Sequence, residues 1–183
     1  MKLPSNANRV FKGILFDVYQ YEEKLYDGST ATFEMLKRTA AMQVVPTIGN
    51  RIVVIEDEQP NRPKAWTLAG GRQDGDENPL DGAKRELLEE TGLASKDWTL
   101  YKEFQPYWKI DWSIYLYIAR NCEKVQEPKP DPGERITLHE VSFDEFVEIA
   151  ASEGFLATGL SLDILRAKTS DTLDEFKNKF FPK

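Results

Sequence analysis

The sequence predicts a domain of the mixed α/β class (α+β), in which helices surround a mixed β-sheet. Three observations lead to this prediction: strand-like stretches separated by turns recur up to about residue 120, one sharply delimited helix lies in mid-chain, and helical periodicity follows residue 142. Strands and helices do not alternate regularly, which disfavours a doubly wound parallel sheet. A length of 183 residues fits one domain with a small N-terminal annex.

The first part of the chain reads as a series of strands. Alternating apolar residues, turn residues at Gly28 and Gly49, and a β-branched run support this reading, although the stretch 30–43 also suits a helix. Its position between two strand-like stretches favours a strand. Strands are predicted for 10–21, 30–43, 44–48, 51–55 and 66–68. Two prolines and three acidic residues predict a loop at 56–64.

The second part combines aromatic strands with C-terminal helices. Strands are predicted for 98–104, 108–119 and 134–141. The proline-rich stretch 127–133 predicts a surface loop. Ser142 and Glu145 have the spacing of a capping box, so a helix should begin there. Further helices are expected near 161–167 and 173–181.

The mid-chain helix is predicted from about residue 79 to 91. Asn78 is a favourable N-cap, Pro79 is tolerated at the first helical position, and Gly92 ends the helix. The apolar face of this helix must meet a core. Three glutamates, Glu86, Glu89 and Glu90, fall together beside that face. Like charges three and four residues apart repel one another, so we expect a positive partner against them.

Charge and composition exclude several classes of partner. With 31 acidic and 24 basic residues the net charge is −7, which argues against nucleic acid or an anionic membrane as the main partner. An anionic substrate is still compatible, because bound metal ions reverse a local field. The single Cys122 cannot form an internal disulfide, and no apolar run approaches the length of a membrane span. The composition therefore predicts a soluble cytoplasmic protein.

The glutamate cluster itself predicts a site for divalent metal. All nearby candidate ligands are oxygens, which suits Mg²⁺ or Mn²⁺ and argues against zinc. Such ions bridge phosphate oxygens, neutralise their charge and activate water, and the hydrolysis of a diphosphate requires all three. Gly70, Gly71 and Gly75 would let a loop pack closely against the site. The alternative is an acidic helix face that meets only solvent.

The whole stretch resembles the signature of the Nudix hydrolases. Its pattern is Gly71-x5-Glu77-x7-Arg85-Glu86-Leu87-x-Glu89-Glu90-x-Gly92-Leu93. The resemblance implies a Nudix α/β/α sandwich with a mixed sheet, and cleavage of a diphosphate bond.

The same resemblance assigns roles to individual residues. Glu86 and Glu90 would be the principal metal ligands, with Glu89 a further ligand or the general base. The carbonyl of Gly70 would be a backbone ligand, and Arg85 would orient Glu89 through an ion pair.

The N-terminal third resembles the ADP-ribose and nucleoside diphosphate sugar pyrophosphatase branch of the family. This implies a β annex at 1–43, an added antiparallel sheet that exchanges strands in a homodimer, followed by a Nudix domain at 44–183. Phe16 would stack on a base or pack in the core. Relatives in this branch often have an arginine after the strand that ends at Ile55; this sequence has acidic residues there, so Arg62 or Arg72 would hold the phosphates instead. Glu134, on the loop before the last strand, would be the general base, with Asp131 and Glu127 as alternatives.

The sequence thus predicts a Mg²⁺-dependent (or Mn²⁺-dependent) enzyme that splits a nucleoside diphosphate sugar, ADP-ribose or a relative such as GDP-mannose, into a nucleoside monophosphate and a sugar phosphate. One alternative is a pyrophosphohydrolase of nucleoside triphosphates or capped RNA. Another is a module that binds nucleotide sugars without cleaving them. Such a module would be expected to have lost glutamates of the signature, and this sequence keeps them.

Overall fold

The central feature of the fold is a mixed β-sheet. The computed structural model describes residues 1–60 and 62–182. Five strands lie in the order β12-β5-β4-β10-β8, and β6 pairs with β5. Their bounds are β4 (Ala41–Ile48), β5 (Arg51–Gln59), β6 (Arg62–Thr67), β8 (Asp97–Phe104), β10 (Ile114–Arg120) and β12 (Arg135–Val141). Strands β4 and β10 are parallel and the other pairs antiparallel, so the sheet is mixed, as predicted.

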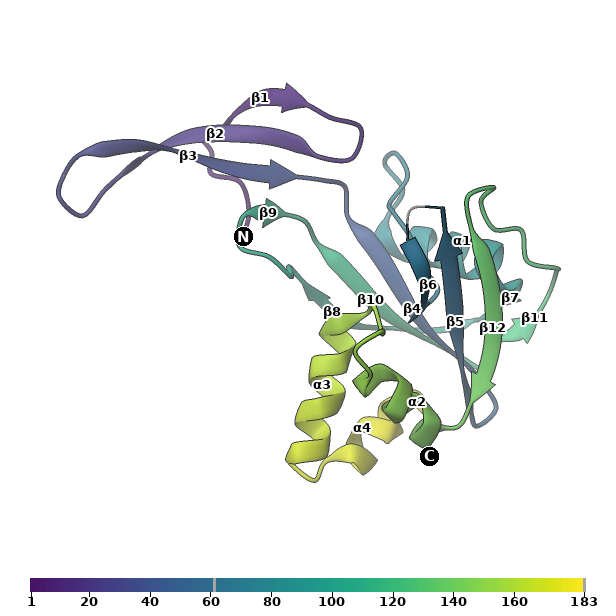
Figure 1. Cartoon of the computed structure of the whole chain (residues 1–183). Helices are drawn as coiled ribbons and strands as arrows, with labels where there is room; N and C mark the ends of the chain where they lie inside the picture. The colour runs from purple at the N-terminus through teal and green to yellow at the C-terminus, as the bar shows by residue number, and fades with distance from the viewer. Residues whose placement is uncertain (61, 183) are drawn as a thin grey trace.

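Helices cover both faces of this sheet. Because successive side chains of a strand point to opposite faces, Val44 packs in the core cluster under α1 (Pro79–Thr91) and Val45 in the other cluster. That second cluster is closed by α2 (Phe143–Ala151), α3 (Thr158–Thr169) and α4 (Leu173–Phe180). Figure 1 shows these three helices gathered on one side of the sheet. The predicted α/β/α sandwich is confirmed.

Helix α1 has the ends that the sequence predicts. The Asn78 side chain accepts a hydrogen bond of 3.0 Å from the Asp81 N–H, and Gly92 ends the helix at a φ of 71°. The capping box that opens α2 is also present, between Ser142 and Glu145. These local signals place the glutamates of α1 at a defined edge of the sheet.

An added sheet is built by the N-terminal residues, as predicted. Its strands lie in the order β1-β2-β3-β9, with bounds β1 (Asn8–Lys12), β2 (Asp17–Lys24), β3 (Thr30–Lys37) and β9 (Ile110–Asp111). The first three are antiparallel, and β9 joins β3 in parallel. This sheet projects from the rest of the molecule (Figure 1). Strand β4 begins at Ala41, so it contains the position 43/44 at which the annex was expected to end.

Three local predictions are wrong. The expected strand 10–21 is two strands, because the chain folds back between Gly13 and Phe16. A Cβ on Gly13 would lie 2.2 Å from the Phe16 carbonyl oxygen, so only glycine allows this close approach. The expected strand 108–119 is likewise divided, into β9 and β10, so that one piece joins each sheet.

The expected loop 56–64 is instead the hairpin of β5 and β6, apart from residue 61, which lies outside the described residues. Its acidic residues do not prevent strand formation because Asp57 is buried and forms an ion pair with Arg62. Pro63 is tolerated because β6 is an edge strand beside β5.

A short ladder of β7 (Leu93–Ala94) and β11 (Glu123–Lys124) follows α1 and completes the strands of the described chain. Within residues 1–60 and 62–182, no helix has the length and apolar character needed to cross a membrane.

Candidate active site

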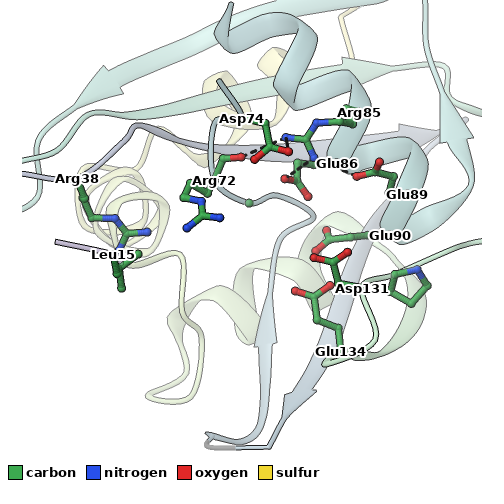
Figure 2. Close-up of a pocket in the computed structure, with 12 residues that line it drawn as sticks. Leu15, Arg38, Arg72, Asp74, Arg85, Glu86, Glu89, Glu90, Asp131 and Glu134 are labelled. Atoms are coloured by element: carbon green, nitrogen blue, oxygen red, sulfur yellow. Dashed lines mark hydrogen bonds and ion pairs between the residues drawn. The ribbon is translucent and has the colours of Figure 1, made fainter. Parts of the chain in front are cut away.

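A cavity of about 310 Å³ lies where α1, the glycine loop after β6 and the loop before β12 meet. Figure 2 shows the side chains that surround it. Its walls are formed by Leu15, Arg38, Gly71, Arg72, Asp74, Arg85, Glu86, Glu89, Glu90, Pro130, Asp131 and Glu134. The structure therefore brings most of the predicted site residues to one place, from three separate parts of the chain.

The glycine loop is packed directly against the glutamates of α1. The Gly70 N–H donates a hydrogen bond of 2.7 Å to Glu90 Oε2, and Gly70 has a φ of 151°, which favours glycine. A Cβ on Gly71 would lie 2.4 Å from Glu86 Oε1. The loop is held in place by the Val44 N–H, which donates to the Ala69 carbonyl at 2.8 Å. The predicted close approach of the loop is thus present, and the loop offers Glu90 a backbone donor.

Of the α1 carboxylates in the cavity, Glu90 is buried and Glu86 is partly buried. Glu90 is 5% exposed, and burial raises its pKa to about 9. Burial also raises the pKa of Glu86 to about 6, although the Arg85 guanidinium partly offsets this effect. Removing a carboxylate from water disfavours its charged form unless a cation lies near. These two groups therefore favour a further positive charge inside the cavity.

Arg85 joins the glutamates to one another. Its Nη1 lies 3.0 Å from Glu89 Oε2 and 2.9 Å from Glu86 Oε1, and its Nη2 lies 2.8 Å from Glu77 Oε1. The guanidinium also donates to the Arg72 carbonyl at 3.1 Å. Glu77 in turn accepts from the Asp74 N–H at 2.9 Å. Arg85 thus contacts Glu89, as the predicted ion pair requires, and connects α1 to the loop.

Glu134 reaches the cavity from the loop before β12 and, together with Asp131, lies beside Glu90 (Figure 2). Burial raises the pKa of Glu134, and the nearby Asp57 carboxylate raises it further. Gln59 Nε2 donates to Glu134 Oε1 at 3.4 Å and to Asp57 Oδ2 at 3.1 Å. Glu134 is therefore a half-buried carboxylate that lies beside the glutamates of α1 in the same cavity (Figure 2).

A basic wall completes the cavity. Arg38 and Arg72 lie across from the carboxylates (Figure 2). The Arg38 guanidinium lies 4.2 Å from the ring centre of Trp112 and 5.4 Å from that of Phe16. Burial lowers the pKa of Arg38, and the charge of Arg72 lowers it further. Because two arginines close together repel one another, their arrangement favours an anion between or beside them.

Arg38 is a residue that sequence reasoning missed. It follows directly on β3, within the stretch 30–43 whose structure was ambiguous in the sequence. Phe16 contacts Arg38 but does not line the cavity, so it reaches the site only through that arginine. Arg62 is bound to Asp57 and lines a separate hollow with residues of the β5–β6 hairpin.

The donor set suits a divalent ion. Among the described residues no three acidic, histidine or cysteine side chains stand ready to hold a metal. The reason is visible in the contacts, because Arg85 holds Glu86 and Glu89 while the Gly70 N–H holds Glu90. Rotation of these side chains toward the cavity would offer only oxygen ligands, and burial makes their charges costly without a cation. The residues present therefore fit a hard divalent cation.

Three known proteins show sequence similarity to this chain. An activator of methanol dehydrogenase from Bacillus methanolicus is 27% identical over 147 residues, covering 78% of this chain and 79% of that protein. An ADP-ribose pyrophosphatase of Bacillus subtilis is 25% identical over 149 residues, covering 79% and 80%. An RNA pyrophosphohydrolase of Bartonella tribocorum is 40% identical over 104 residues, covering 46% of this chain and 59% of that protein.

The fold also has a counterpart among solved structures. A crystal structure of an ADP compounds hydrolase superposes with a TM-score of 0.72 at 18% identity, and the match covers 92% of this chain and 95% of that chain. The family model of the NUDIX domain matches residues 37–157, which include the glycine loop, α1 and Glu134. Because that match spans well over half of the sequence, the chain belongs to the Nudix family and is a Nudix hydrolase.

Proposed function

We propose that this protein hydrolyses the diphosphate of a nucleoside diphosphate sugar, ADP-ribose or a relative such as GDP-mannose, to a nucleoside monophosphate and a sugar phosphate. The observation that carries the proposal is the division of one cavity into an acidic wall of four glutamates and a basic wall of two arginines. A diphosphate needs both walls, because its oxygens are anionic and its hydrolysis requires metal and a base.

The family generally uses divalent ions, and we assign Mg²⁺, with Mn²⁺ as an alternative, to Glu86, Glu89, Glu90 and the Gly70 carbonyl. When bound, the metal would neutralise phosphate oxygens and lower the pKa of the attacking water. Arg85 holds Glu89 and Glu86 in position.

The basic wall orients the substrate. Arg72, and Arg38 beside it, bind phosphate oxygens in this proposal, since a guanidinium presents paired donors to an anion. Arg62 lies farther back, engaged by Asp57, and its predicted phosphate contact has no support from the cavity lining. Phe16 holds Arg38 from one side and could meet a base only at the edge of the cavity.

The general base is one of two carboxylates. Glu134 faces the cavity from a loop and Glu89 from α1. Glu134 is favoured because Arg85 already forms an ion pair with Glu89, whereas Glu134 accepts, from the residues that the structure describes, only a long hydrogen bond from Gln59. A half-buried carboxylate with a raised pKa suits proton abstraction from water.

A substrate panel tests the proposed reaction. We expect turnover of ADP-ribose or GDP-mannose with Mg²⁺ to yield a nucleoside monophosphate and a sugar phosphate, measured by chromatography and mass spectrometry. The panel includes nucleoside triphosphates and 5′-triphosphorylated RNA, because relatives include RNA pyrophosphohydrolases. Faster cleavage of the triphosphates would select that alternative, and no cleavage of any diphosphate-linked nucleotide would overturn the proposal.

We also propose that the annex at 1–43 joins two copies of the chain. It forms a projecting sheet with exposed apolar side chains, among them Phe11 at 60% and Ile14 at 102% relative exposure. Light scattering after size-exclusion chromatography should give the mass of a dimer, about twice 21.0 kDa. A chain that lacks this segment loses part of the cavity wall, so the full chain with Phe11→Ser and Ile14→Ser is the better variant and should be monomeric. A monomeric unmodified chain would contradict the assignment.

We also propose a cytoplasmic location, and the state of the single cysteine supports it. Cys122 is buried, and burial raises the pKa of its thiol to about 11. A buried, protonated thiol resists oxidation, as expected for a cysteine that stays reduced. Fluorescence microscopy of the tagged chain would test the location, and export from the cell would contradict it.

A further inference from the structure

A basic trough of about 540 Å³ adjoins the active-site cavity. The two share Leu15, Arg38, Arg72 and Asp74 in their walls, so they form one continuous hollow. Beyond the shared residues the trough runs along the N-terminal sheet. Its charged side chains are Arg9, Lys12, Lys37, Arg38 and Arg72 against Asp17 and Asp74.

The excess of positive charge is local. The chain as a whole carries −7, whereas the trough is lined by five basic and two acidic side chains. Both acidic side chains already have a cation near them, since Asp17 lies 3.0 Å from Arg9 and Asp74 lies 3.8 Å from Arg85. The trough is therefore a positive region on an otherwise acidic protein, which attracts anions.

Strand pairing places two of the lysines on the same face of the N-terminal sheet. Lys12 on β1 is the register partner of Asp17 on β2, and Asp17 is the partner of Lys37 on β3. Directly paired residues of neighbouring strands point to the same face of a sheet. Lys12 and Lys37 thus flank one carboxylate that Arg9 also contacts. Three cations, Arg9, Lys12 and Lys37, therefore share one carboxylate, and a net positive charge is left on this face.

The size of the first cavity decides where the substrate extends. At about 310 Å³ it lies at the lower end of the roughly 300–1,000 Å³ range of small-molecule sites. A diphosphate bound between the acidic and basic walls would fill most of this cavity. Whatever is attached to the diphosphate must continue outward, and the trough is the hollow that shares walls with the cavity.

We propose that this trough binds a second anionic group of the substrate, a phosphate monoester carried by the nucleoside or the sugar beyond the diphosphate that is cleaved. The inference rests on the proposed function and extends it by naming the class of substrate. Lys12 and Lys37 would contact the monoester, and Arg38 would stand between the two phosphate positions. An uncharged sugar or base would leave the lysines in solvent.

Matched substrates test the trough. Rates are measured with Mg²⁺ for ADP-ribose, for 2′-phospho-ADP-ribose and for ADP-ribose 1″-phosphate, which carry the extra phosphate at opposite ends. At least one phosphorylated compound should have a kcat/KM roughly 5- to 10-fold above that of ADP-ribose, because two exposed charge contacts contribute modestly. The preference should shrink as salt is raised.

A double variant assigns the preference to the trough. In Lys12→Gln/Lys37→Gln the ratio of kcat/KM for the phosphorylated compound over ADP-ribose should fall to about 1. The control is Lys24→Gln/Lys168→Gln, two exposed lysines outside the trough, which should keep the ratio of the unmodified protein. Equal rates for all three compounds, or a preference that survives in the double variant, would overturn the inference.

A binding measurement separates this inference from the proposed reaction. Isothermal titration calorimetry without divalent metal compares the Kd of the three compounds for the unmodified chain and both double variants. If none of the compounds is hydrolysed, the proposed function fails, yet tighter binding of a phosphorylated compound that is lost only in Lys12→Gln/Lys37→Gln would still support the trough. Equal Kd values would overturn it.

Discussion

Replacing Glu90 by glutamine should abolish hydrolysis while the protein remains folded. The amide keeps an oxygen that can accept the Gly70 N–H, now 2.7 Å from Glu90 Oε2, and nearly preserves the side-chain volume. It removes the charge that a divalent ion requires. Loss of metal-dependent stabilisation should lower kcat on the order of 10³-fold or more, equivalent to about 4 kcal/mol. Steady-state kinetics at saturating Mg²⁺ measure this effect.

Thermal unfolding provides the control for Glu90→Gln. Because Glu90 is buried, an uncharged side chain removes the cost of burying a carboxylate, so Tm in EDTA should be unchanged or higher. Added Mg²⁺ should raise Tm for the unmodified protein and much less for the variant. Glu148→Gln, an exposed glutamate of α2 on the other face of the sheet, controls for charge removal. Full activity in Glu90→Gln would refute its role as a metal ligand.

Glutamine at position 134 should produce a loss of kcat with little change in KM. Glu134 faces the cavity but lies on a different element from the glutamates of α1, so its removal leaves that cluster in place. Loss of a general base typically lowers the rate by about 10²- to 10⁴-fold. The measurement is kcat and KM for the best substrate of the panel, compared at equal Mg²⁺ occupancy.

Two other variants make the result for Glu134→Gln decisive. Asp131→Asn changes a carboxylate on the same loop and in the same cavity, and it should retain most of the rate. Glu89→Gln removes the other candidate base, and a smaller loss there than in Glu134→Gln supports the assignment. A large effect of Glu89→Gln beside near-normal turnover in Glu134→Gln would move the base to α1.

Local signals in the sequence were sufficient where neighbouring residues decide the structure. The ends of α1 follow from Asn78, Pro79 and Gly92, whose preferences act within a few residues. The spacing of Glu86, Glu89 and Glu90 along one helix likewise predicts that they can reach one point. Both predictions about α1 depend on 3.6 residues per turn and on no distant contact.

The errors arose where pairing between elements overrides the preference of a single segment. Acidic and proline residues near 56–64 predict a loop in isolation, but Arg62 neutralises Asp57 and β12 covers the other edge of β5. Similarly, 10–21 and 108–119 each look like one strand, yet 10–21 folds back so that β1 pairs with β2, and 108–119 is divided between the two sheets. Periodicity alone contains no information about which strand will be the neighbour.

The sequence by itself determined the chemistry of α1: three glutamates at helical spacing, their counter-charge Arg85 and a glycine loop to approach them. Only the tertiary structure decided which residues join α1 around the cavity. It added Arg38, at the end of β3, and it brought Arg72 and Glu134, which the family resemblance had suggested, into the same cavity from the glycine loop and the loop before β12. The physical reason is that helical geometry is set by local hydrogen bonds, whereas the far walls of a cavity are set by sheet order and packing.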